Sequence, residues 1–177
     1  MDRSELKFNG NIFLIGFMGC GKSTVSRALC EKYGMERIEM DEQIEREEGM
    51  TIPEIFSEKG EDYFREMETK LLKGFSEREH LAVSCGGGTA MRECNVLEMK
   101  KHGKIVLLSA EPATVYERVR NSHNRPLLEG NMNVEYIRSL MEQRRARYEA
   151  AADFTVETEH KTAGEIADEI MKYIVKR

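Results

Sequence analysis

The stretch Ile12-Phe13-Leu14-Ile15-Gly16-Phe17-Met18-Gly19-Cys20-Gly21-Lys22-Ser23 decides the fold of this chain. Its first four residues are apolar, as expected for a buried strand, and the rest follow the pattern G-x-x-x-x-G-K-S. The segment Lys22–Lys32 contains neither Gly nor Pro and predicts a helix. A strand that leads through a glycine-rich turn into a helix is the structural context of a phosphate-binding loop. The sequence therefore predicts a site for a nucleoside triphosphate.

The glycine-rich turn has the chemistry that a phosphate group requires. Glycine permits positive φ and close approach, so successive backbone N–H groups can point at phosphate oxygens, and the following helix adds partial positive charge. In this pattern Lys22 reaches the β- and γ-phosphates and the Ser23 hydroxyl ligates Mg²⁺. A loop that merely turns the chain is the alternative. The expected nucleotide-binding residues of the loop are Gly19, Cys20, Gly21, Lys22, Ser23 and Thr24.

The composition is typical of one compact enzyme domain. The chain has 177 residues, of which 40% are hydrophobic, so we expect a single core and one domain over residues 1–177. A net charge of −5 argues against a general nucleic-acid-binding protein. Apolar runs fall short of the roughly 20 residues that cross a bilayer, so we expect no membrane partner, and the short polar N-terminus is unlike a secretory signal.

The four cysteines indicate a reducing compartment. They stand at positions 20, 30, 85 and 94, without a C-x-x-C pair and without a His at zinc-ligand spacing. This arrangement is typical of free thiols rather than of a disulfide framework or a metal site, so we expect a cytoplasmic protein. We also expect a monomer, because assigning the core leaves no apolar helical stripe uncovered.

Short strand-like segments alternate along the chain with longer helical patterns. The expected strands are Asn11–Ile15, Met35–Met40, Leu81–Cys85, Lys104–Ser109 and Phe154–Glu157. The expected helices are Lys22–Lys32, Asp41–Glu48, Ile52–Glu79, Ala90–Lys101, Pro112–Arg120, Val134–Ala152 and Ala163–Val175. This alternation predicts a three-layer α/β/α fold, in which helices cover both faces of a parallel sheet. Right-handed crossovers then place the carboxyl ends of the strands along one edge.

Two carboxylates close the second expected strand at this edge. Glu39 and Asp41 would lie next to the phosphate loop, where carboxylates hold Mg²⁺ through water or orient an acceptor hydroxyl. For Asp41, an N-cap of the helix that follows is an equally good interpretation.

Three glycines, Gly86, Gly87 and Gly88, follow the third expected strand. Glycines after an apolar strand favour a place where another molecule approaches the backbone closely. A tight strand-to-helix turn is the alternative interpretation, because glycine serves both purposes.

A polar, turn-rich segment, residues 121–131, is long enough to be a mobile lid. The arginines within it and around it are Arg125, Arg118, Arg144, Arg145 and Arg147. A lid arginine can neutralise charge on a transferring phosphoryl group, and a guanidinium can also hold a carboxylate in a bidentate fork. A solvated surface position is the alternative for each of these arginines.

These motifs together resemble the shikimate kinase family, and the resemblance runs from Asn11 to Val175. Many enzymes share the phosphate loop alone, whereas five further elements in the same order are far more specific. In chain order these elements are Asp41 with Ile44-Glu45, then Ile52, Glu54-Ile55-Phe56, Gly60-Glu61, Phe64-Arg65 and Glu68, then Gly86-Gly87-Gly88, then Arg125-Pro126-Leu127-Leu128, and finally Arg144, Tyr148 and Ala152.

The resemblance implies a P-loop kinase fold with a five-stranded parallel sheet of order 2-3-1-4-5. It implies a lid at about 121–133 and a substrate-binding helical region at about 41–79. The implied reaction is ATP- and Mg²⁺-dependent phosphorylation of the 3-hydroxyl of shikimate, which gives shikimate 3-phosphate and ADP in the biosynthesis of aromatic amino acids.

The resemblance also assigns roles to single residues. Asp41 is the carboxylate that contacts the shikimate hydroxyls and assists proton removal from the attacking one. Arg65 and Arg144 grip the substrate carboxylate in a pocket lined by the backbone of Gly86, Gly87 and Gly88. Arg125 is the lid arginine that closes over the phosphates, and Arg118 packs on the adenine ring.

Two positions depart from the family pattern. Where the family commonly has an Asp that supports the magnesium shell, this chain has Glu39, which keeps the charge and adds a methylene. Where the family tends to have Pro near the adenine, this chain has Ala163. The first departure bears on metal geometry and the second on adenine packing.

Other functions fit parts of the pattern. A gluconate or nucleotide kinase shares the loop and the lid, but neither predicts Arg65, the triple glycine and Arg-Pro-Leu-Leu together. A GTPase would usually carry an Asn-Lys-x-Asp motif, which this sequence lacks. An inactive, partner-binding relative would not need to keep Lys22, Asp41, Arg65 and Arg125, all of which are present.

Overall fold

A five-stranded parallel sheet forms the centre of the protein. The computed structural model describes residues 8–121 and 133–176. Its strands are β1 (Asn11–Ile15), β2 (Glu36–Glu39), β3 (Leu81–Ser84), β4 (Gly103–Ser109) and β5 (Phe154–Glu157). They lie in the order β2-β3-β1-β4-β5, and every neighbouring pair is parallel. The predicted fold and strand order are confirmed.

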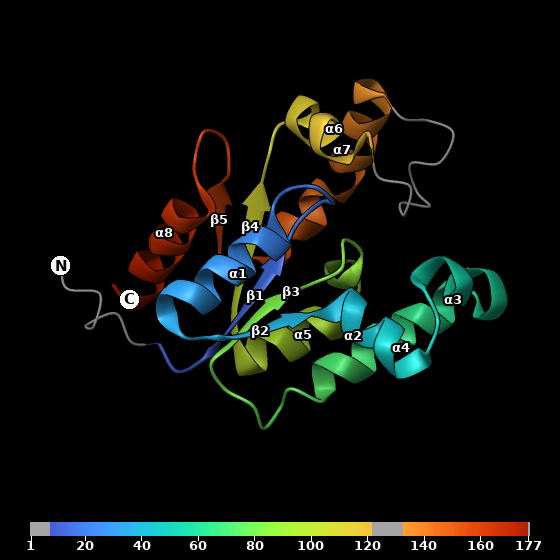
Figure 1. Cartoon of the computed structure of the whole chain (residues 1–177), viewed down its shortest axis with the longest axis horizontal. Helices are drawn as coiled ribbons and strands as arrows, with labels where there is room; N and C mark the ends of the chain where they lie inside the picture. The colour runs from blue at the N-terminus through green and yellow to red at the C-terminus, as the bar shows by residue number, and fades with distance from the viewer. Residues whose placement is uncertain (1–7, 122–132, 177) are drawn as a thin grey trace.

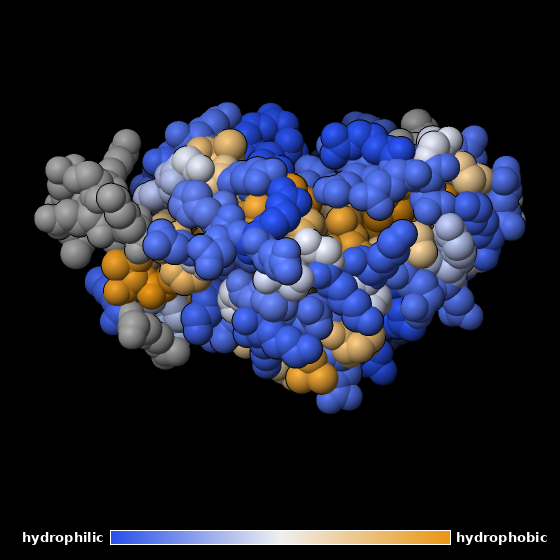
Figure 2. All heavy atoms as spheres, turned by 90° about the horizontal axis from the view of Figure 1, so that it is seen from below, coloured by the Kyte–Doolittle hydropathy of each residue, from blue (hydrophilic) through white to orange (hydrophobic). Residues whose placement is uncertain are grey.

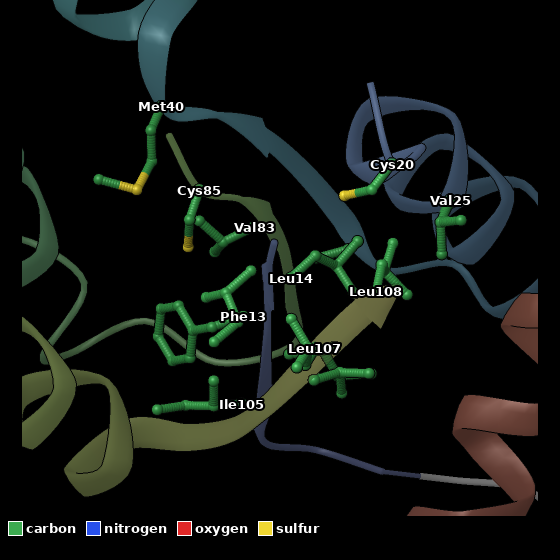
Figure 3. Close-up of a cluster of buried hydrophobic side chains, with 14 of the residues drawn as sticks. Phe13, Leu14, Cys20, Val25, Met40, Val83, Cys85, Ile105, Leu107 and Leu108 are labelled. Atoms are coloured by element: carbon green, nitrogen blue, oxygen red, sulfur yellow. The ribbon is translucent and has the colours of Figure 1, made fainter. Parts of the chain in front are cut away.

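The central strand is the apolar run that precedes the phosphate loop. All five residues of β1 are buried, as expected for a strand covered on both faces. Phe13 is in register with Val83 on one side and with Ile105 on the other. Figure 3 shows Phe13 and Ile105 together on one side, while Leu14 and Leu108 lie on the other side with Val25 of the first helix.

Helices cover both faces of this sheet (Figure 1). They are α1 (Lys22–Tyr33), α2 (Met40–Glu48), α3 (Ile52–Lys59), α4 (Glu61–Lys73), α5 (Glu93–His102), α6 (Pro112–Val119), α7 (Val134–Ala151) and α8 (Ala163–Val175). On one face α1 packs against α8, β2 and β3, and on the other α5 packs against β4 and α4. Helices α6 and α7 contact each other near the carboxyl end of β4.

The prediction of one long helix over residues 52–79 is wrong, because two helices, α3 and α4, lie in that segment. Helix α3 ends and α4 begins at Gly60, whose φ of 85° and ψ of 165° are far from helical values. Glycine adopts this conformation without the clash that a Cβ would cause. Helix α4 then ends before Gly74, so residues 74–79 are not helical. The α2–α4 segment therefore folds back as separate short helices beside the sheet edge.

A second helix is shorter than expected. Residues 90–101 were expected to be one helix, but a 3₁₀ turn, η2 (Thr89–Met91), precedes α5. Arg92 separates the two with extended backbone angles of −103° and 123°. Because Arg92 is extended, α5 begins only at Glu93.

The surface is largely polar. Figure 2 shows a face covered mostly by hydrophilic residues, with hydrophobic atoms in separate groups. Among the residues that the structure describes, the large hydrophobic side chains counted as exposed are Leu97 and Val175. Within the same residues, every helix is too short or too polar to pass through a bilayer.

Candidate active site

The carboxyl ends of three neighbouring strands bring the predicted site residues together. β1 leads into the phosphate loop, β2 into Glu39 and α2, and β3 into the triple glycine. Because β3 lies between β2 and β1, the glycines stand between the acidic residues and the loop. This is the edge at which parallel α/β sheets bind ligands.

The phosphate loop has the predicted conformation. Gly21 has a φ of 101° and is the N-cap of α1, with no side chain capping the helix. The first N–H groups of α1 therefore remain available to an anion. Lys22 is buried, and its Nζ donates hydrogen bonds to the carbonyl oxygens of Gly16 at 2.7 Å and Phe17 at 3.0 Å. The loop thus holds the ammonium group at its own centre.

Two other loop residues differ in their surroundings. Cys20 is buried, with its Sγ 3.8 Å from Lys22 Nζ, so its side chain fills the space beneath the loop. Thr24, in the first turn of α1, is exposed. Both stay predictions as nucleotide-binding residues.

Glu39 reaches the phosphate loop directly. Its Oε2 accepts a hydrogen bond from Ser23 Oγ at 2.8 Å, and its Oε1 accepts one from Ser26 Oγ at 3.0 Å. Arg37, two residues earlier on β2, pairs with Glu39 Oε1 at 2.8 Å. The carboxylate at the end of β2 is therefore fixed against the hydroxyl that the sequence predicts as a metal ligand.

The donors around Ser23 fit a hard cation. Among residues 8–121 and 133–176, the structure contains no cluster of three or more His, Cys, Asp or Glu side chains that could hold a metal ion. Mg²⁺ does not need one, because it prefers oxygen ligands, keeps several waters and combines one or two protein groups with phosphate oxygens. A serine hydroxyl with a carboxylate 2.8 Å behind it matches that pattern.

Asp41 is not the N-cap of α2. Helix α2 begins at Met40 with Glu39 as its N-cap residue, so Asp41 lies inside the first turn. The alternative interpretation of Asp41 as a capping residue is therefore wrong, because the helix starts two residues earlier than a cap at this position requires. A Cβ built on Gly86 would lie 3.1 Å from Asp41 Oδ1, which places the carboxylate against the triple glycine.

Both predicted carboxylate-binding arginines meet at the triple glycine. Arg144 Nη1, from α7, donates a hydrogen bond to the carbonyl oxygen of Gly87 at 3.2 Å. Arg65, from α4, lies so close to Gly88 that a Cβ there would come within 2.6 Å of the arginine Cζ. A larger residue at position 88 would therefore displace the guanidinium from its place beside the turn. The helices that carry the two arginines are far apart in sequence, and the turn after β3 brings them together.

Glu68 is a buried acid to which the motif gave no role. It is 0% exposed, and its Oε2 accepts a hydrogen bond from Arg65 Nη1 at 2.8 Å. Burial acts to lower the pKa of Arg65, but the carboxylates of Glu68 and Glu61 outweigh it, so the pKa is raised. Arg65 and Glu68 are three residues apart on one helix face, between apolar positions. That spacing could have indicated the pair.

Tyr148 is a second residue that the motif contained without a role. Its hydroxyl donates a short hydrogen bond to the same Gly87 carbonyl oxygen that Arg144 contacts. Burial raises the pKa of Tyr148 to about 12, so the phenol remains a neutral donor at ordinary pH. Two side chains of α7 therefore fix the middle glycine of the turn.

Removing the Tyr148 hydroxyl should change the alkaline stability. The unfolded phenol ionises near its ordinary pKa of about 10, whereas the folded one ionises near 12, so folding stability falls as pH rises through this window. Tyr148→Phe should lack this component, a difference of about 2 kcal/mol between pH 9 and pH 11.5. Urea unfolding of both proteins at the two pH values measures it. An identical decline in the variant would show that Tyr148 is not the group responsible.

Arg118 lies on the other side of the phosphate loop, together with Glu159, an acid that the sequence did not predict for the site. Arg118 Nη1, on α6, donates to the carbonyl oxygen of Gly19 at 3.0 Å. Glu159, in the segment between β5 and α8, accepts hydrogen bonds from the backbone N–H of Glu111 at 3.0 Å and from Thr114 at 3.1 Å, which lower its pKa. Glu159 thus ties that segment to the helix that carries Arg118.

The remaining arginines do not join this cluster. Arg145 pairs with Glu142 and Glu149 on the surface of α7, as the surface interpretation expected, and Arg147 donates to the Met91 carbonyl oxygen. Arg125 and the rest of residues 122–132 lie outside the described part of the chain.

A parallel sheet with a phosphate loop at its central strand, and a second group of charged side chains beside that loop, define a P-loop kinase of small molecules. The comparisons with known proteins narrow this class. The family model described as shikimate kinase matches residues 18–175. The chain belongs to the shikimate kinase family.

Individual relatives agree with this assignment. A shikimate kinase of Persephonella marina is 42% identical over 161 residues, covering 91% of this chain and 96% of the relative. The solved structure of shikimate kinase from Acinetobacter baumannii in complex with shikimate has a TM-score of 0.91 and 34% identity, covering 99% of this chain and 98% of that one.

A more distant solved structure shares only the fold with this chain. A gluconokinase from Sinorhizobium meliloti has a TM-score of 0.62 at 22% identity, covering 96% of this chain and 94% of that one. At this identity the likeness shows a shared fold alone.

Proposed function

We propose that this chain transfers the γ-phosphoryl group of ATP to the 3-hydroxyl of shikimate, forming shikimate 3-phosphate and ADP. Membership of the shikimate kinase family supports the reaction. The observation that carries the assignment to this site is the position of Gly87. A Cβ on Gly87 would lie 3.5 Å from Arg144 Nη1 and 4.0 Å from the Gly16 carbonyl oxygen, so the arginine pocket borders the phosphate loop.

The donor side of the site would bind ATP. The backbone N–H groups of residues 19–24 and the N-terminus of α1 would hold the phosphates, with Lys22 at the β- and γ-phosphates. Arg118 would pack on the adenine, and its helix is held to the β5–α8 segment by Glu159. Arg125 as the lid arginine stays a prediction from the sequence. Together with Lys22 it would balance charge on the transferring group.

We further propose that Mg²⁺ binds at Ser23, with Glu39 behind it. When bound, the ion would neutralise charge on the phosphate oxygens and help to orient them. Ser23 would supply the hydroxyl ligand, and Glu39 would orient that hydroxyl and the metal-bound water. Arg37 and Ser26, which hold the other carboxylate oxygen, would keep Glu39 in place.

Replacing Glu39 with Gln should weaken magnesium binding. The amide keeps the size of the side chain but removes the negative charge that faces Ser23, so the half-saturating Mg²⁺ concentration should rise about tenfold. Displacement of Mn²⁺ from the ATP-loaded protein, followed by electron paramagnetic resonance, gives a readout that does not depend on turnover. Glu36→Gln is the matched control, because Glu36 is on the same strand but pairs with Arg78 at the surface. Equal metal affinity in both variants would contradict the role of Glu39.

The acceptor side would hold shikimate by its carboxylate. Arg65 and Arg144 would bind the carboxylate, and a planar guanidinium suits this because it can donate two parallel hydrogen bonds. The backbone of Gly86, Gly87 and Gly88 would line the pocket. Asp41, at the glycine turn, would orient the 3-hydroxyl for in-line attack and accept its proton as the oxygen–phosphorus bond forms. The bond from the γ-phosphorus to the bridging oxygen breaks at the same time, and ADP leaves.

An ADP-release assay with several acceptors tests this proposal. Shikimate, gluconate and nucleoside monophosphates are offered separately at equal concentration with ATP and Mg²⁺. We expect shikimate to be the preferred acceptor by at least about a hundredfold in kcat/KM. A nucleoside monophosphate has no carboxylate for the two arginines, and the open-chain gluconate, which has one, must lose conformational freedom on binding. Preferred turnover of gluconate or a nucleotide would overturn the proposal. The lack of a nucleic-acid partner, the monomeric state and the cytoplasmic location stay predictions.

A further inference from the structure

Four polar side chains between α4 and α5 are almost completely hidden from solvent. Glu68, Thr89 and Asn95 are each 0% exposed, and Thr69 is 8% exposed. Burying a polar group without a hydrogen bond costs about 1–3 kcal/mol, so such a cluster is stable only when its members bond to one another. They do so in a continuous chain.

The chain of hydrogen bonds begins at the site arginine. Glu68 Oε2 accepts from Arg65 Nη1 at 2.8 Å, while its other oxygen, Oε1, accepts from Thr89 Oγ1 at 2.6 Å. The carbonyl oxygen of Thr89 accepts from Asn95 Nδ2 at 2.9 Å. Asn95 Oδ1 in turn accepts a hydrogen bond from Thr69 Oγ1 at 2.7 Å. The series of hydrogen bonds therefore ends on α4, one turn beyond Arg65.

The geometry of the glycine turn depends on the same bonds. A Cβ at Gly86 would come within 2.7 Å of Glu68 Oε1 and 3.2 Å of Thr89 Oγ1, so the bond between them occupies the space beside this glycine. Thr89 follows Gly88 directly and forms η2, the 3₁₀ turn that the sequence did not predict. The Thr89 hydroxyl therefore links two parts of the site. These are the glycine turn that lines the proposed pocket and the Glu68 carboxylate that holds Arg65.

We propose that Thr89, Asn95 and Thr69 are positioning residues for Arg65. Thr89 holds Glu68 in the orientation that aims the Arg65 guanidinium at the substrate carboxylate. Asn95 and Thr69 hold Thr89 in place by joining its backbone to α4. The three residues act through Glu68 and Arg65, and we assign them no contact with substrate. This inference rests on the proposed function, because it concerns how the shikimate carboxylate is recognised.

Isosteric substitutions at Thr89 isolate the hydroxyl. Thr89→Val keeps the shape of the side chain and removes the donor to Glu68, whereas Thr89→Ser keeps the donor. A hydrogen bond to a charged group is worth enough to change an equilibrium about tenfold or more. We therefore expect Thr89→Val to raise KM for shikimate about tenfold, with KM for ATP changed less than twofold and Thr89→Ser close to wild type. Thr69→Val should raise the same KM about threefold.

A double-mutant cycle with Arg65 separates positioning from general damage. If Thr89 acts through Arg65, Thr89→Val should lower kcat/KM for shikimate about tenfold in the wild type and less than twofold in an Arg65→Ala background. Thr158→Val is the matched control, because Thr158 is a buried threonine whose hydroxyl donates to the Ser109 carbonyl oxygen at 3.1 Å, away from α4. We expect it to leave KM for shikimate unchanged even if it lowers thermal stability.

Several outcomes would overturn the positioning role. They are equal KM values for Thr89→Val and Thr89→Ser, parallel increases in both substrate KM values, or additive losses in the Arg65→Ala background. A normal Thr69→Val enzyme would overturn the roles assigned to Thr69 and Asn95. A wild-type protein that prefers another acceptor would instead contradict the proposed function, so the two failures are distinguishable.

Discussion

Replacing Lys22 with Met is expected to reduce kcat for shikimate phosphorylation by about 10³-fold. The variant keeps the length of the side chain but removes the ammonium group that the loop carbonyls of Gly16 and Phe17 hold at the phosphate site. Charge that develops on the transferring group would then lack a fixed positive partner in a place where water screens little.

Single-turnover kinetics with saturating ATP and shikimate measure this loss. Lys73→Met is the control, because Lys73 is an exposed lysine at the end of α4. Calorimetric titration with ADP shows whether the variant still folds and binds nucleotide. A kcat within tenfold of wild type would contradict the assigned role of Lys22.

Arg65→Ala should raise KM for shikimate about a hundredfold and KM for ATP less than threefold. Removing one partner of a desolvated charge pair costs about 2–5 kcal/mol, and here the substrate carboxylate would lose one of its two arginines. The steady-state KM for each substrate, measured at saturation with the other, tests the split. Equal effects on both substrates would count against the assignment of Arg65.

The same substitution leaves the buried Glu68 carboxylate without Arg65, which threatens stability as well as binding. Arg65→Ala combined with Glu68→Gln removes the unpaired charge and serves as the control for folding. Thermal unfolding should show the double variant to be more stable than Arg65→Ala, while KM for shikimate stays high in both. Recovery of a normal KM in the double variant would mean that the arginine itself is not needed.

The parts of the molecule that local sequence determines were the most predictable. The phosphate loop follows from spacing, and the five strands follow from short segments, apolar or alternating, between helical patterns. The sheet and the start of α1 therefore agree with expectation. The break at Gly60 was missed because the charged residues on both sides favour helix. One glycine conformation, which periodicity does not report, divides the segment.

The composition of the site was less predictable than its location. The resemblance named Arg65 and Arg144, and the structure places both at the triple glycine. The contacts of Tyr148 and Glu159 join segments distant in the chain, whereas the i,i+3 spacing of Arg65 and Glu68 on α4 was a local signal. Glu159, for example, bonds to Glu111, 48 positions away. A single sequence carries no direct signal for such pairs. Asp41 shows the opposite case, since a two-residue difference in where α2 begins decides whether it is the N-cap or lies inside the first turn.

The identity of the phosphorylated product shows whether this protein transfers the phosphoryl group to the 3-hydroxyl of shikimate. Incubation with ATP, Mg²⁺ and shikimate, followed by two-dimensional ¹H–³¹P NMR of the purified product, shows which oxygen carries the phosphate. We expect a single product in which the phosphorus couples to the hydrogen on carbon 3 of the ring. Phosphate on another hydroxyl, or ATP hydrolysis without a phosphorylated acceptor, would contradict it.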